Sequence, residues 1–237
     1  CDINNFDKLS IYCSEIKKLG FKIIRPDVNS SDTNFKVNYD KNNNPISINF
    51  GLSAIKNIGE ASINEFVKER KKNGNFINLT DLLRRVSNNV MNKKILESLI
   101  FSDSLKSLEK NQKLLNDNIN KIILYNTNFH KNFHENQSGL FPVNDDLEDL
   151  VNEDGSSWDI NEKLEKEIDA FGFYLSEHPT KIHKRVLKNI NVSDLEQLNI
   201  QDTDNVKTKI NLYIAMINSI NERRSKTGKR FCFFNIS

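Results

Sequence analysis

A short turn, Asn57-Ile58-Gly59-Glu60, is the first place in this sequence where residue types and spacing could do chemistry. Apolar residues at helical spacing lie on both sides, so we expect one helix to enter the turn and another to leave it. Gly59 suits a backbone that needs a positive φ, and Asn57 is the residue type that tolerates one next best. The second helix would begin with unpaired N–H groups and a positive dipole end, which together attract an anion.

We interpret this stretch as a helix-hairpin-helix, which holds a nucleic-acid phosphate without reading the base sequence. Lys56 adds a long cationic side chain beside the turn. The predicted DNA-binding residues are therefore Lys56, Asn57, Ile58, Gly59 and Glu60. The alternative is two packed helices joined by a glycine turn that binds nothing, and the stretch alone does not decide between them.

A basic turn near the end of the sequence holds the second group of candidate ligands. Apolar and polar residues alternate from Ile210 to Ile220, and Phe231 to Ile236 forms a second strand-like run. Between and beside these strands lie the cations Arg223, Arg224, Lys226, Lys229 and Arg230. A small oligonucleotide-binding barrel could begin in this way, with cations for the backbone and aromatic rings for the bases. A solvated β-turn explains the charges equally well.

The adjacent pair Leu140 and Phe141 stands in a polar setting shortly after Gln137. The acidic residues from Asp145 to Asp159 have no basic residue among them, so we expect a flexible linker there that DNA repels. The apolar pair either docks back onto the preceding helices or inserts into a pocket on a partner protein.

The sequence offers little to a metal ion or to catalysis. His130 and His134 are four residues apart, but a third ligand is not evident. The three cysteines are too few and too scattered for a disulfide framework or a CxxC site, and they favour a reducing cytoplasm. We expect no catalytic residue, no metal and no cofactor in this chain.

Composition is that of a folded protein with long polar connections. The 237 residues are 37% apolar and 28% charged, with a net charge of +2. No apolar run is long enough to span a bilayer, and no signal-peptide pattern is present, so we expect no membrane partner. The chain begins with Cys1 and ends in an apolar run, which suggests an internal piece of a longer protein.

The expected elements are mainly α-helical with small β elements, an α+β chain. A helical stripe covers 3–19, a short strand 21–24, and alternating apolar residues over 35–50 predict a β-hairpin with one buried face. Residues 51–105 predict a compact helical unit, possibly two hairpins in tandem, with Asn78 or Thr80 and Asn92 as helix caps. A longer helix is expected from 105 to about 125, where helical signals stop, and another over 162–175.

Six motifs resemble, in the same order, those of bacterial DNA polymerase III alpha subunits, the C-family replicative polymerases. They are 20–30 (GFKIIRPDVNS), 50–60 (FGLSAIKNIGE), 92–100 (NKKILESLI), 137–141 (QSGLF), 164–179 (LEKEIDAFGFYLSEHP) and 226–229 (KTGK). Each motif alone is weak, but six in one order are specific, and the resemblance covers nearly the whole chain.

The resemblance implies five parts. They are the C-terminal part of the fingers (1–50), a tandem helix-hairpin-helix unit (51–125), a clamp-binding motif with an acidic linker (126–160), a helical connector (161–205) and the start of an OB-fold barrel (206–237). It further implies that Gln137, Leu140 and Phe141 bind the sliding clamp, the beta subunit. The other implied partners are double-stranded primer–template DNA, single-stranded template DNA and further replicase subunits.

The parent protein would be a DNA-directed DNA polymerase whose palm carboxylates hold Mg²⁺ upstream of the matched region. This piece alone is then expected to be inactive. Three positions depart from the family pattern: Arg25 replaces a proline, Asn57 replaces the first hairpin glycine, and Asp103 puts a negative charge where a second phosphate would sit. The runner-up is a stand-alone helix-hairpin-helix adaptor of DNA repair or recombination, and a third reading is a scaffold that binds no nucleic acid.

Overall fold

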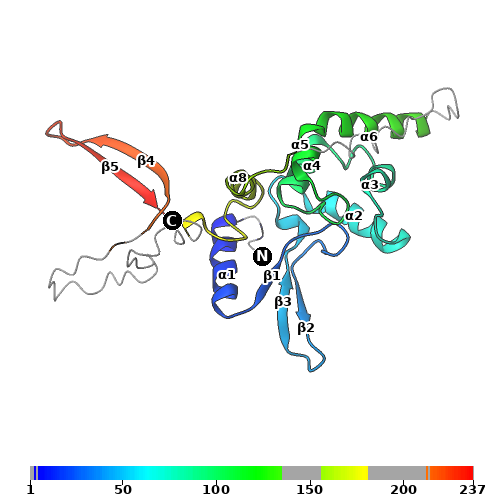
Figure 1. Ribbon diagram of the computed structural model, residues 1–237, viewed down its shortest axis with the longest axis horizontal. Coiled ribbons are helices and arrows are strands. Elements are labelled where there is room, and N and C mark those ends of the chain that lie inside the picture. Colours follow the sequence, from blue (N-terminus) through cyan, green and yellow to red (C-terminus); the bar gives the residue numbers. More distant parts are fainter. Residues whose placement is uncertain (1–2, 4, 135–155, 181–211, 213, 237) are drawn as a thin grey trace. The chain divides into compact units, whose positions relative to one another are not determined.

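The computed structural model describes residues 3, 5–134, 156–180, 212 and 214–236. The chain divides into two units, Cys1–Leu175 and Ser176–Ser237. The first unit combines helices with a three-stranded sheet, and the described part of the second contains a two-stranded ribbon (Figure 1). The predicted α+β class is confirmed. The five predicted domain boundaries remain predictions.

The first unit opens with α1 (Phe6–Lys18), which buries Leu9 and Cys13. The side chain of Asn5 caps its start, and Gly20 follows its end with a φ of 85°. Three short strands come next, β1 (Lys22–Ile24), β2 (Lys36–Tyr39) and β3 (Pro45–Asn49). In the sheet order β1-β3-β2, β3 is antiparallel to β2, as the predicted hairpin requires, and also parallel to β1.

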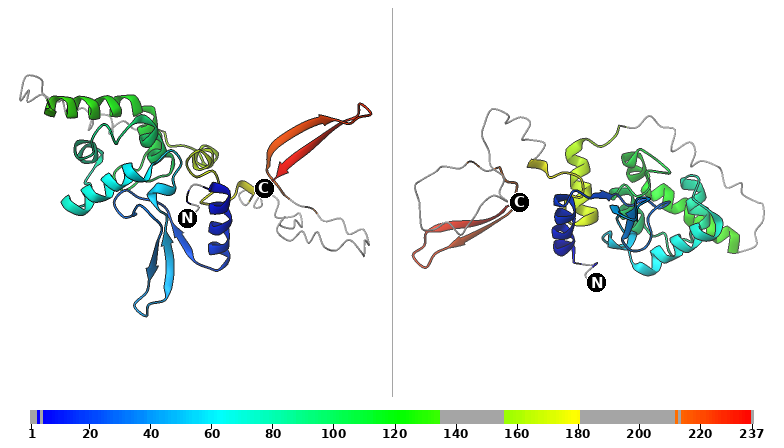
Figure 2. Two further views of the ribbon diagram at one scale, coloured as in Figure 1. Left: turned by 180° about the vertical axis from the view of Figure 1, so that it is seen from behind. Right: turned by 90° about the horizontal axis from the view of Figure 1, so that it is seen from below.

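The prediction that this hairpin buries one apolar face is wrong. Val37, Tyr39 and Ile46 are 39%, 55% and 50% exposed, although Phe50 at the end of the hairpin is fully buried. The hairpin projects away from the helices of its unit, so no described helix of that unit covers its tip (Figure 2). Alternation predicted the strands correctly, but it does not show what covers them.

Six helical segments follow the sheet: η1 (Leu52–Ala54), α2 (Glu60–Asn73), α3 (Leu79–Arg85), α4 (Lys93–Phe101), α5 (Gln112–Asp117) and α6 (Ile119–His134). Asparagine side chains cap the starts of α3, α4 and α5. Asn78, Asn92 and Asn111 accept hydrogen bonds from the N–H of Asp81, Ile95 and Leu114, at 2.8, 3.0 and 3.2 Å. Of the two candidate caps for α3, Asn78 is the one used and Thr80 is not, and the cap predicted at Asn92 is confirmed.

The predicted end of the helix near residue 125 is wrong, because α6 runs on to His134. Asn126 is fully buried, and its side chain donates to the carbonyls of Leu83 and Val86 at 2.6 and 3.1 Å. The Nε2 atom of His130 lies 3.0 Å from the same two carbonyls. These polar residues therefore cover the C-terminal end of α3, and their polarity does not mark a linker. The predicted long helix over 105–125 is instead a turn, α5 and the first part of α6.

After an undescribed stretch comes α8 (Ile160–Phe171), whose start carries a capping box between Asp159 and Glu162. Its last residue, Phe171, is fully buried and packs edge to face against Phe50, with the two ring centres 5.0 Å apart. The helix lies against α4 and joins the same hydrophobic core as α1 to α6. The second unit contributes β4 (Ile217–Arg224) and β5 (Arg230–Ile236), paired antiparallel.

Candidate nucleic-acid interface

The first hairpin turn connects η1 to α2. Asn57 has a φ of 63°, whereas Gly59 is extended with φ −78° and ψ 145° and is the N-cap of α2. The prediction that Gly59 supplies the positive φ is therefore wrong, and Asn57 supplies it. A Cβ atom at Gly59 would meet nothing within 4 Å, so neither space nor φ requires glycine there.

The start of α2 presents a row of backbone donors. Ile63 is the first residue of the helix whose N–H bonds back, to the carbonyl of Gly59 at 3.2 Å. Among the described residues, no hydrogen bond uses the N–H of Gly59, Glu60, Ala61 or Ser62. Ile58 is only 6% exposed and anchors the turn in the core. Four outward donors at the positive end of a 14-residue helix suit an anion such as a phosphate.

Lys56 lies beside this turn but points away from its donors. Its N–H donates to the carbonyl of Ala170 at 2.8 Å, and its Nζ donates to the carbonyl of Ile168 at 3.2 Å. The ammonium also lies 5.4 Å from the centre of the Phe6 ring. The structure therefore places this charge at the C-terminal end of α8, where the helix dipole favours a cation. A direct phosphate contact by Lys56 stays a prediction.

A second turn follows α4 at residues 102–105 and, like the first, contains one non-glycine residue with a positive φ. Asp103 has a φ of 66°, close to that of Asn57. Its own N–H bonds to Ile100, and the N–H of Ser104 bonds to Leu99, at 3.0 and 2.9 Å. A run of turns comes next, and α5 begins only at Gln112. The second turn therefore lacks a helix start directly behind it.

The carboxylate of Asp103 is engaged within the protein. It pairs with Lys106 at 3.2 Å and with Arg25 at 4.0 Å, and it accepts a hydrogen bond from the side chain of Gln112. Arg25 also pairs with Glu167 of α8, whose side chain is 4% exposed. Burial lowers the pKa of Arg25 from its ordinary value, and the charge of Asp103 opposes that shift. Two departures from the family pattern, Arg25 and Asp103, thus meet in one ion-pair cluster.

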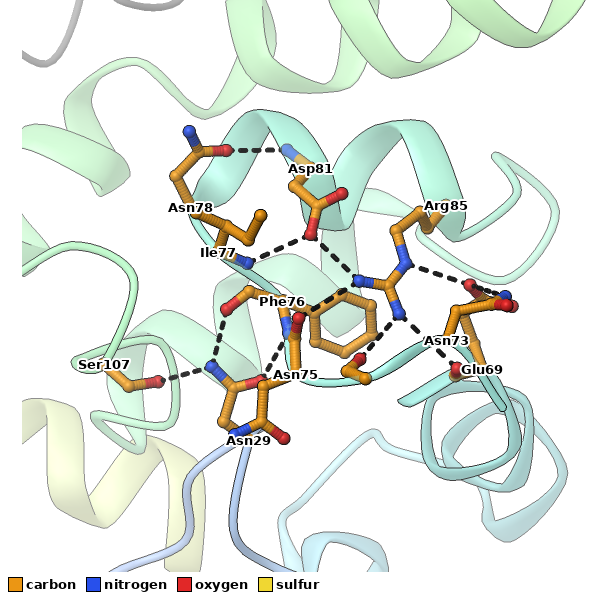
Figure 3. A network of polar contacts seen from close by, with 11 residues as sticks. Asn29, Glu69, Asn73, Asn75, Phe76, Ile77, Asn78, Asp81, Arg85 and Ser107 are labelled. Atoms are coloured by element: carbon orange, nitrogen blue, oxygen red, sulfur yellow. Dashed lines mark hydrogen bonds and ion pairs between the residues drawn. The ribbon is translucent and has the colours of Figure 1, made fainter. Parts of the chain in front are cut away.

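A polar network fixes the connection between α2 and α3 (Figure 3). The guanidinium of Arg85 donates to the carboxylates of Glu69 and Asp81, both at 2.9 Å, and to the carbonyl of Gly74 at 2.7 Å. The guanidinium also lies 4.5 Å from the centre of the Phe76 ring. Arg85 of α3 is thereby bonded to α2, to its own helix and to the loop between them. These bonds fix the orientation of α2, which begins at the first turn.

In the second unit, the five predicted cations lie on one ribbon. Arg223 and Arg224 end β4, Arg230 begins β5, and Lys226 and Lys229 lie in the turn between them. Directly paired residues share a face of a two-stranded ribbon, and the register pairs Arg223 with Phe231 and Asn221 with Phe233.

The two faces of this ribbon differ in chemistry. One carries the rings of Phe231 and Phe233, 5.5 Å apart, with the guanidinium of Arg223 5.8 Å from the Phe233 ring. The other pairs Ile220 with Phe234 and Ile217 with Ile236. The first face suits stacked bases and a phosphate backbone, and the second suits the core of a barrel.

The predicted clamp-binding residues Gln137, Leu140 and Phe141 lie outside the described residues. Within the parts that the structure describes, no group of three or more metal-binding side chains comes together. No described helix has the length and apolarity needed to cross a membrane.

Comparisons with known proteins agree with this geometry. The model of a helix-hairpin-helix motif family matches residues 20–115, which include both turns. The chain is similar to the DNA polymerase III subunit alpha of Borreliella burgdorferi, at 31% identity over 99% of this chain and 20% of that protein. The corresponding subunits of Neisseria meningitidis serogroup A and of Buchnera aphidicola subsp. Schizaphis graminum are 32% and 33% identical, over 85% and 97% of this chain and 17% and 20% of theirs.

These relatives agree with one another in name and in the extent of the match. The chain spans about one fifth of the length of the curated relatives it matches. The matches cover nearly all of this sequence, and the helix-hairpin-helix match falls on the turn that presents the free donors. The chain belongs to the family of bacterial DNA polymerase III alpha subunits.

Proposed function

We propose that this chain is the part of a replicative DNA-directed DNA polymerase that grips the newly made duplex. The observation that carries the proposal is the row of N–H groups at Gly59, Glu60, Ala61 and Ser62, which bond to no acceptor in the described part of the chain. These donors are backbone groups, so they bind phosphate and do not distinguish between bases. A polymerase that moves along any template needs a contact of this kind.

The residues we assign to duplex binding are Asn57, Ile58, Gly59 and Glu60, with the donors of α2 behind them. Asn57 reverses the chain, Ile58 anchors the turn, and Gly59 and Glu60 present their N–H groups. Lys56 lies directly before these residues, with its ammonium on α8. We assign no phosphate to the second turn, because the carboxylate of Asp103 lies there and is already paired with cations of the protein.

We further propose that the second unit begins an OB-fold that binds the single-stranded template. The cations Arg223, Arg224, Lys226, Lys229 and Arg230 would attract the backbone, and the rings of Phe231 and Phe233 would stack against bases. The difference between the two faces of the ribbon supports this assignment. Gln137, Leu140 and Phe141 are proposed to bind the sliding clamp, on the strength of the QSGLF motif alone.

The remaining proposals concern the whole protein. Nucleotide addition would take place in a palm whose carboxylates hold Mg²⁺ and which lies outside this chain, so we expect the chain by itself to be inactive. We expect the protein to work in the cytoplasm with other replicase subunits. The similar proteins share the name of a DNA polymerase subunit and are about five times as long as this chain. Both facts favour a part of a polymerase over a stand-alone repair adaptor.

Filter binding against salt concentration tests the proposed duplex grip. We expect binding to duplex DNA that does not depend on sequence and that weakens with a log–log slope of roughly −0.9 for each phosphate neutralised. Absence of duplex binding by the folded chain at low salt would refute the proposal and favour a scaffold.

A further inference from the structure

The helix α8 is bonded to Lys56 beside the first turn and is linked to the second turn through Arg25, although it lies outside the matched helix-hairpin-helix region. That region ends at residue 115, and α8 begins at Ile160. Lys56 of the first turn bonds to two carbonyls near the end of α8. Glu167 of α8 pairs with Arg25, which in turn pairs with Asp103 of the second turn. Among the described elements, α8 alone is linked to both turns. Its carbonyls accept hydrogen bonds from Lys56, and its Glu167 is linked to Asp103 through Arg25.

Gly172 leaves the space that Lys56 occupies. It ends α8 with a φ of 80°, and a Cβ atom there would lie 2.9 Å from Cε of Lys56 and 3.0 Å from Cβ of Phe6. The stem of Lys56 therefore runs across the end of α8 in close contact with the backbone. Its ammonium ends on the carbonyl of Ile168, one turn back into the helix.

We propose that α8 holds the first turn in its phosphate-binding conformation, with Lys56 as the positioning residue, so that the DNA-binding unit extends to the end of α8. This inference rests on the proposed function and adds a residue role to it. The N–H of Lys56 is bonded to Ala170 and that of Ile58 to Ile55, and among the described residues the donors at Gly59 to Ser62, which follow them, have no bond. Fixing the backbone at Lys56 leaves those donors pre-arranged for a phosphate, which reduces the ordering cost of binding.

The variant Lys56→Met tests this, because methionine keeps most of the apolar stem and removes the ammonium. Two measurements on the same protein are needed. One is the affinity for duplex DNA across a range of salt concentrations. The other is the rate of amide hydrogen exchange without DNA at positions 56, 58 and 63, the amides around the turn whose N–H groups are hydrogen-bonded. Lys68→Met is the matched control, since Lys68 is an exposed cation on α2 with 74% of its side chain accessible.

A positioning role predicts a loss of roughly three- to tenfold in duplex affinity at every salt concentration, the size of one hydrogen bond. The salt slope should stay unchanged, and exchange at positions 56, 58 and 63 should speed up in Lys56→Met but not in Lys68→Met. If Lys56 instead contacts a phosphate, the slope should become shallower by about 0.9 and exchange should not change. That second result would overturn the proposal.

Two further outcomes are separated by the same data. If the unaltered chain does not bind duplex DNA but exchange at positions 56, 58 and 63 still accelerates in Lys56→Met, the proposed grip fails and the support by α8 stands. If Lys56→Met does not fold, Lys56→Gln keeps a donor at this position. Its exchange rates must then lie between those of the unaltered chain and those of a chain opened by mild denaturant. Exchange in Lys56→Gln as slow as in the unaltered chain, with a shallower slope, would again overturn the proposal.

Discussion

The side-chain amide of Asn29 pairs with both backbone groups of Phe76, 47 residues away (Figure 3). It donates to the carbonyl at 2.9 Å and accepts from the N–H at 2.8 Å. This pair fixes the loop after β1 to the connection between α2 and α3. Asn29 belongs to segment 20–30, one of the motifs that resemble the family. Its side chain pairs with a backbone carbonyl and a backbone N–H of the same residue, as a neighbouring strand would.

Replacing Asn29 by alanine should lower the free energy of unfolding by about 1–3 kcal/mol, because it leaves both partly buried groups of Phe76 unpaired. Urea unfolding measures the loss. Asn42→Ala in the exposed turn between β2 and β3 is the control, and it should cost less than about 0.5 kcal/mol. Equal losses in the two variants would mean that the Asn29 pair contributes nothing specific.

The Glu69 carboxylate gives the network around Arg85 a pH dependence. Hydrogen bonds from Asn73 and Arg85 lower the pKa of Glu69 below its ordinary value. A carboxyl with a depressed folded-state pKa stabilises the fold above its unfolded pKa, and this contribution is lost as pH falls through the folded pKa. Urea unfolding at pH 7 and in steps down to pH 3 should show a smaller loss for Glu69→Gln than for the unaltered chain. Parallel curves would show that this carboxylate does not contribute.

Local signals in the sequence predicted much of this fold. Asparagine before an apolar helical stripe predicted the caps at Asn78 and Asn92, because capping involves only neighbouring residues. The parallel pairing of β1 with β3 joins strands more than 20 residues apart and leaves no mark in either strand. The exposure of Val37 and Tyr39 depends on what packs against the sheet, which alternation does not encode.

The candidate site shows the same limit. The sequence located the first turn, but we expected the positive φ at Gly59, because glycine is the usual residue for that backbone conformation. The structure has it two positions earlier, at Asn57, and local sequence does not show which of the two residues reverses the chain. Asn126 and His130 are polar, so in the sequence they resembled the start of a linker. In the structure they cover the end of α3, and the sequence does not show that α3 lies next to them. The contact of Lys56 with α8 spans 112 residues and was likewise outside the reach of local patterns.

The two faces of the second unit's ribbon provide a matched pair of variants, in a chain long enough to complete the barrel. Phe233→Ala should weaken single-strand binding by about 1–3 kcal/mol, the value of one stacked base, and leave duplex binding unchanged. Phe234→Ala on the opposite face should lower thermal stability instead. Fluorescence anisotropy with labelled single strands separates the two, and a greater binding loss from Phe234→Ala would reverse the face assignment.

The proposed clamp contact rests on two adjacent apolar residues. The pair Leu140→Ala and Phe141→Ala should abolish binding to the sliding clamp, because two buried side chains of this size supply roughly 3–6 kcal/mol before ordering costs. Duplex affinity and thermal stability should stay nearly unchanged. Surface plasmon resonance with immobilised clamp gives the affinity. A variant that melts several degrees lower and still binds the clamp would show that these residues belong to a core.

The most direct test of the duplex grip removes one backbone donor and leaves the fold in place. Glu60 is the first residue of α2, where proline is well tolerated, and Gly59 before it already has the extended backbone that precedes proline. Glu60→Pro removes an N–H and a negative charge, whereas Glu60→Ala removes only the charge. With both variants equally stable, the account predicts that Glu60→Pro binds duplex DNA about tenfold more weakly than Glu60→Ala, since a hydrogen bond to a charged phosphate is worth roughly 1.5–3 kcal/mol. Equal duplex affinity of the two folded variants would contradict it.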